Sequence, residues 1–67
     1  MLEEIQDRLD AVPFIPFRIV VTSGDRFEVM NPNELTVAQS VLYLVDLRSD
    51  QHAVIRANQL CYVETLD

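Results

Sequence analysis

The first apolar positions of the chain recur with the period of a helix. Leu2, Ile5, Leu9 and Val12 are spaced three, four and three residues apart, which places them on one stripe of a helix. Pro13 ends the pattern, because proline cannot continue a helix. We therefore predict a helix within residues 1–12 that docks its apolar stripe on a larger body, since so short a helix is marginal in water on its own.

The pattern changes from helical to strand-like at Phe17. Residues 13–17 (PFIPF) predict a stiff extended connector, because each proline fixes its own φ angle. From Phe17 the period is two, so that Ile19 and Val21 share one side of a strand with it. The segment Ser23-Gly24-Asp25 contains the only glycine and predicts the turn of a β-hairpin, whose second strand runs from residue 26 to 30.

The remaining sequence predicts more short strands separated by tight turns. They cover residues 35–38, 41–45, 53–55 and 60–64, with a polar loop at 46–51. One helix before five or six strands leaves too few helical crossovers for a parallel sheet. We predict a single mainly β (α+β) domain, residues 1–67, in which the helix caps a small antiparallel SH3-like or Sm-like barrel formed by residues 17–66.

The predicted fourth strand, VLYLV at 41–45, is apolar on both faces. Such a strand is buried on both sides. One side would face the core, and the other would face either the helix or another subunit. Val41, Tyr43 and Val45 are therefore the candidate oligomer interface.

Chain length supports self-association. A core built from 67 residues is thin, and small domains are usually reinforced by disulfides, a metal or oligomerisation. Cys61 is the only cysteine, so an intrachain disulfide is impossible, and no cluster of metal ligands stands out in the sequence. A homo-oligomer or a protein partner is the expectation.

Charge narrows the possible partners. Eleven acidic residues against five arginines and no lysine give a formal net charge of −6, which disfavours nucleic acid and anionic membrane surfaces. The same charge suits an acidic regulator that binds a basic protein. No apolar run could span a membrane, and the start Met1-Leu2-Glu3-Glu4 is acidic where a signal peptide is basic, so a cytoplasmic location is expected.

The sequence predicts no enzyme activity, cofactor or metal. His52 and Cys61 are the only residues of their types, and a Cys–His site would need the fold to bring them together with Asp46 or Asp50. A lone strand cysteine is more often a small core residue, and a lone loop histidine is more often solvated. A chain of this size is also not expected to enclose a substrate pocket.

Three segments carry a resemblance that covers most of the chain. They are PFIPFRI at 13–19, SGDR at 23–26 and NPNE at 31–34. Together they resemble a group of short uncharacterised bacterial proteins with the motifs PFxPFRI, DGR and HPE. This chain has an aspartate inserted before the arginine of the second motif, and asparagines at 31 and 33 in the third. The resemblance implies a fold and no particular activity.

A second resemblance covers about ten residues near the C-terminus. The segment VIRANQLCYV at 54–63 is similar to the second signature motif of Sm and Sm-like proteins, IRGN between strand residues. The resemblance implies an RNA-binding ring in which Arg56 and Asn58 form a base pocket, and Tyr62 is added as a residue that could stack on a base. Ala57 replaces the motif glycine, and the family's first motif is absent. A plain turn between two strands remains the alternative interpretation of these residues.

Overall fold

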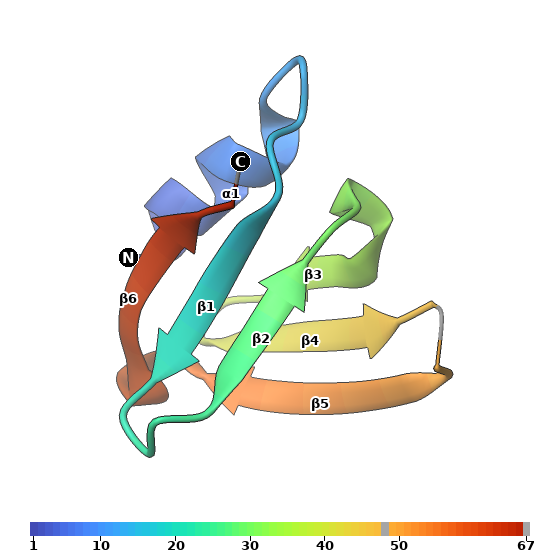
Figure 1. Ribbon diagram of the computed structural model, residues 1–67. Helices are drawn as coiled ribbons and strands as arrows, with labels where there is room; N and C mark the ends of the chain where they lie inside the picture. The colour runs from blue at the N-terminus through green and yellow to red at the C-terminus, as the bar shows by residue number, and fades with distance from the viewer. Residues whose placement is uncertain (48, 67) are drawn as a thin grey trace.

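The computed structural model describes residues 1–47 and 49–66 and shows a mainly β protein with one N-terminal helix (Figure 1). The prediction of a leading helix followed by five or six antiparallel strands is confirmed. The elements are α1 (Leu2–Asp10), β1 (Phe17–Val21), β2 (Arg26–Val29), β3 (Leu35–Val37), β4 (Val41–Asp46), β5 (Gln51–Arg56) and β6 (Leu60–Thr65), with 3₁₀ turns η1 (Pro32–Glu34) and η2 (Ala57–Gln59).

The strands form two antiparallel sheets of three, in the orders β2-β1-β6 and β3-β4-β5. Within the described residues, 1–47 and 49–66, no strand of one sheet pairs with a strand of the other. The predicted closed barrel is therefore not found. The break between β2 and β3 has a local cause. Pro32 has no backbone N–H to give to a ladder, and the Asn31 side chain instead accepts a hydrogen bond from the Asn33 N–H at 3.2 Å, which starts η1.

The first hairpin turns where the sequence predicts it. The carbonyl of Val21 accepts the Gly24 N–H at 2.9 Å, and the Val21 N–H donates to the Asp25 carbonyl at 3.1 Å. Gly24 has a φ of 94°, in the left-handed region where glycine has no Cβ penalty. The four residues 22–25 connect β1 and β2 in a register in which Arg18 lies opposite Glu28.

The helix is shorter than predicted and Val12 does not belong to its stripe. It ends at Asp10, and Ala11 is extended, with φ −66° and ψ 142°. Val12 is 96% exposed, so its assignment to the buried stripe was wrong. Proline at 13 disfavours the helical region for Val12, and leaving the helix there turns the side chain away from the core. Ile5 has no exposed surface and anchors the helix.

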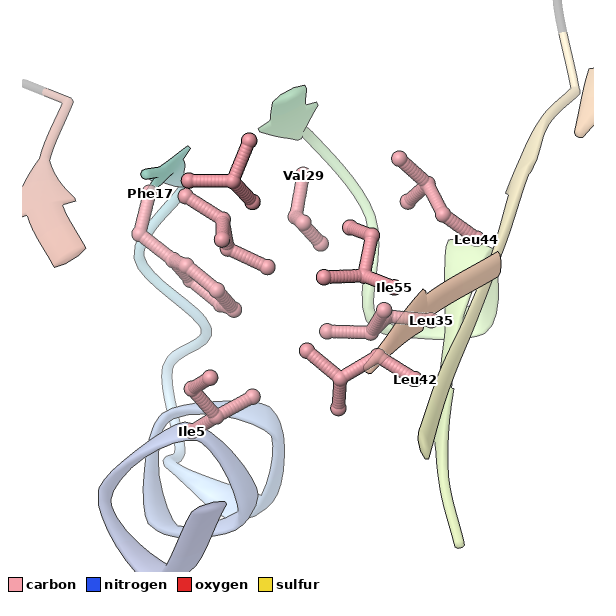
Figure 2. Packing of buried hydrophobic residues seen from close by; sticks show 9 residues of the cluster. Ile5, Phe17, Val29, Leu35, Leu42, Leu44 and Ile55 are labelled. Atoms are coloured by element: carbon pink, nitrogen blue, oxygen red, sulfur yellow. The ribbon is translucent and has the colours of Figure 1, made fainter. Parts of the chain in front are cut away.

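The core lies between the two sheets and under the helix (Figure 2). Phe17 and Ile19 enter it from β1 and Leu42 from β4, while Ile5 of the helix closes the end near Phe17 and Leu42. The full buried cluster consists of Ile5, Phe17, Ile19, Val21, Val29, Leu35, Leu42, Leu44 and Ile55. Arg8 fastens the helix to both neighbouring strands: its guanidinium lies 5.7 Å from the centre of the Phe17 ring and donates to Thr65 Oγ1 at 3.0 Å.

Candidate interaction surfaces

Strand β4 separates its apolar side chains between the core and the solvent. Leu42 and Leu44 point inward and are buried. Tyr43 is 48% exposed and Val45 is 39% exposed, while Val41 on the same side is half-buried. The predicted burial of the inward side is therefore confirmed. The helix does not cover the other side, so that alternative was wrong, and burial of this side against another subunit stays a prediction.

The neighbouring strand β5 extends this apolar surface by one residue, Val54. Tyr43 lies opposite Thr36 of β3 and opposite Val54 of β5, which is 59% exposed. We call the outward side of this sheet the outer face; its strand positions are Thr36, Val41, Tyr43, Val45, His52, Val54 and Arg56. None of these seven residues is acidic, although the chain carries a net charge of −6. The outer face thus combines exposed apolar side chains with an absence of negative charge.

The other sheet presents a charged surface to solvent. Arg18, at the centre of β1, reaches carboxylates on both adjacent strands: Glu28 of β2 at 3.0 Å and Glu64 of β6 at 3.5 Å. The hydrogen bond to Glu28, together with the negative charge of Glu28 and Glu64, raises the pKa of Arg18 above its ordinary value. This row of alternating charge was missed in the sequence, because Arg18, Glu28 and Glu64 come together only through strand pairing.

The structure brings together two of the three residues suggested by the Sm-like resemblance. Arg56 ends β5 and Asn58 lies in η2, and both line a shallow hollow of about 240 Å³ together with Ser40 and Val41. The turn is held by the Arg56 N–H, which donates to Gln59 Oε1 at 3.0 Å. Tyr62 does not line this hollow; it is 45% exposed on β6 of the other sheet.

The residues considered for catalysis or metal binding are on separate sheets. His52 is exposed on β5, and Cys61 is exposed on β6. Within residues 1–47 and 49–66, no three side chains of histidine, cysteine, aspartate or glutamate are arranged to hold a metal ion. No helix in the same residues is long and apolar enough to cross a membrane.

Known proteins give no indication of function for this chain. No protein-family model, no curated protein and no solved structure matches the chain.

Proposed function

We propose that this chain is a non-enzymatic, cytoplasmic β module that associates with a second copy of itself through the outer face. The observation that carries the proposal is the row of Tyr43, Val45 and Val54, which are exposed on a surface without a carboxylate. Burying a fully exposed apolar side chain of this size contributes about 1.5–3 kcal/mol, and these three side chains, which are already partly buried, contribute correspondingly less each. The module's fold is proposed to be an open relative of the SH3-like and Sm-like barrels.

Charge makes the outer face the surface where a second copy is opposed least. Two molecules that each carry −6 repel one another wherever their acidic surfaces approach. The outer face is a surface where this repulsion is weakest, because its strand positions include Arg56 and no acid. A chain of 67 residues also gains from association, since its own core is small.

The test is a comparison of two valine-to-glutamate variants by size-exclusion chromatography with light scattering, from micromolar to millimolar concentration. Val54→Glu puts a carboxylate into the proposed interface, where an unpaired charge raises the dissociation constant by at least about tenfold. Val12→Glu makes the same change at an exposed valine outside the outer face, and it should behave like the wild type. A wild-type chain that is monomeric throughout this range, or equal behaviour of both variants, contradicts the proposal.

A second candidate is binding of single-stranded RNA at the hollow that Arg56 and Asn58 share. That arrangement favours it, whereas the net charge of −6 and the position of Tyr62 on the other sheet do not. Adding a labelled oligonucleotide at low salt to the same samples separates the two functions. Binding that is lost in Arg56→Ala supports the RNA function, and absence of binding removes it.

A third candidate, an acidic regulator of a basic protein partner, rests only on the net charge of −6. It predicts association that does not depend on Val54 and weakens as salt is added.

A further inference from the structure

A second hollow, of about 510 Å³, lies where the two sheets diverge. Its lining comes from β1 and β2 of one sheet and from β4 and β5 of the other, which separate toward the right of Figure 1. The helix α1 closes the core at the Ile5 end, away from Leu44 (Figure 2). The volume falls within the range of about 300–1,000 Å³ that is typical of small-molecule sites. The hollow is open to solvent, so the expectation that so short a chain does not enclose a substrate pocket stays a prediction.

The floor of this hollow is apolar. Phe27 and Ala53 are half-buried and pack against the core cluster, and Leu44 belongs to it. Ala53 lies opposite Leu44 in the β4–β5 register, and both residues line the hollow. The small alanine side chain leaves space beside the larger leucine. A ring or short hydrocarbon placed here would extend the core and remove apolar surface from water.

The charged side chains around the floor leave one arginine to bind an anion, because both carboxylates, Glu28 and Asp46, already interact with other residues. Two arginines and two carboxylates line the hollow, so its formal charge is zero in a chain of −6. Glu28 is already engaged by Arg18 at 3.0 Å. Arg26 makes no ion pair and no side-chain hydrogen bond within residues 1–47 and 49–66, and its guanidinium is exposed. Arginine binds carboxylates with two parallel hydrogen bonds, which makes it the natural anchor for such a group.

We propose that the hollow between the sheets binds a small carboxylate with an apolar, ring-sized body. The body lies on Phe27, Leu44 and Ala53, and the carboxylate pairs with Arg26. The apolar floor of this site faces the inside of the sheets, whereas Tyr43 and Val54 of the outer face point away from it. His52 is the one outer-face position that also lines the hollow, so the two surfaces meet there.

The experiment is a titration of the ¹⁵N-labelled 67-residue chain with phenylacetate, followed by two-dimensional NMR. We expect saturable shifts of backbone amides around Arg26, Phe27 and Ala53. The neutral analogue 2-phenylacetamide should bind about tenfold more weakly, as expected for loss of a charge-assisted hydrogen bond. In Arg26→Gln the affinity for phenylacetate should fall by the same factor, and the two ligands should then bind alike.

Arg56→Gln is the matched control, because it removes an exposed arginine that does not line this hollow. Equal weakening in Arg56→Gln, equal binding of phenethylamine, or shifts that do not saturate would overturn the proposal. Ala53→Met fills the floor without changing charge and should abolish binding, which tests the site independently of Arg26. Val54→Glu should leave phenylacetate binding unchanged, so that failure of the self-association proposal and failure of this one are told apart.

Discussion

The two sheets carry the same geometry and opposite chemistry on their solvent sides. We call a row of three directly opposite residues across a sheet a rung. The charged rung of β2-β1-β6 consists of Glu28, Arg18 and Glu64, and the apolar rung of β3-β4-β5 consists of Thr36, Tyr43 and Val54. In each rung the central strand places a long side chain between two shorter ones from its neighbours. The side chains of the charged rung pair with one another and stay hydrated, so covering them brings no benefit. The apolar rung is stabilised only when another surface covers it and removes it from water. Comparing them indicates which side of the molecule is built to remain in solvent.

The largest effect is expected when the charged rung is copied onto the outer face. The variant Thr36→Glu, Tyr43→Arg, Val54→Glu copies the charged rung onto the outer face. Its cross-strand pairs should preserve the sheet, while the apolar contacts of the proposed interface disappear. We expect the dissociation constant for self-association to rise by about 100-fold or more, measured by light scattering.

Two controls show whether the loss of association in the triple variant is specific. Thermal unfolding followed by circular dichroism should show that the triple variant still folds. Tyr43→Phe removes only the hydroxyl group, so it should associate as the wild type does. If the triple variant folds and still forms an assembly of the same molar mass as the wild type, the difference between the rungs has no bearing on self-association.

An intermediate effect is expected at the corner that joins the two sheets. Glu34, the buried acid of η1, accepts the Met30 N–H on Oε1 at 2.9 Å, just where the chain leaves β2 for β3. In Glu34→Ala this N–H loses its partner, at a cost of about 1–3 kcal/mol in the free energy of unfolding. Glu34→Gln keeps an acceptor oxygen and should lose less. Urea denaturation of both variants measures the difference, and equal stability would remove the role given to this bond.

The sequence predicts the elements of both sheets better than the contrast between them. Alternation at Phe17, Ile19 and Val21, with the turn at Gly24, is enough to place β1 and β2, because strand period and turn geometry are local properties. The apolar face at Tyr43 is also visible, since VLYLV is a local pattern. Asn31 before Pro32 signals a turn, but the sequence does not show that the chain passes from one sheet to the other there.

What the sequence could not predict depends on distant residues. Arg18 meets Glu28 across a hairpin and Glu64 across a pairing of the first and last strands, and only the second of these needs the whole fold. The lining of the larger hollow comes from four strands, so the spacing of its residues along the chain carries no signal. Val12 fits the helical period and was assigned to the helix, although the proline beside it had the stronger local effect.

The smallest effect is expected when the charged rung itself is broken. Arg18→Gln removes both ion pairs and should lower the unfolding temperature only slightly, because exposed ion pairs gain little in water and are screened by salt. The pKa of Arg18 is raised in the folded chain, so its contribution is complete below the unfolded pKa and is lost only as pH rises through the folded one, in strongly alkaline solution. The difference between Arg18→Gln and wild type should therefore be constant between about pH 6 and pH 9 and should shrink as salt is added. A difference that does not change with salt would mean that Arg18 acts by packing and not by charge, and the contrast between the two sheets would then be one of shape.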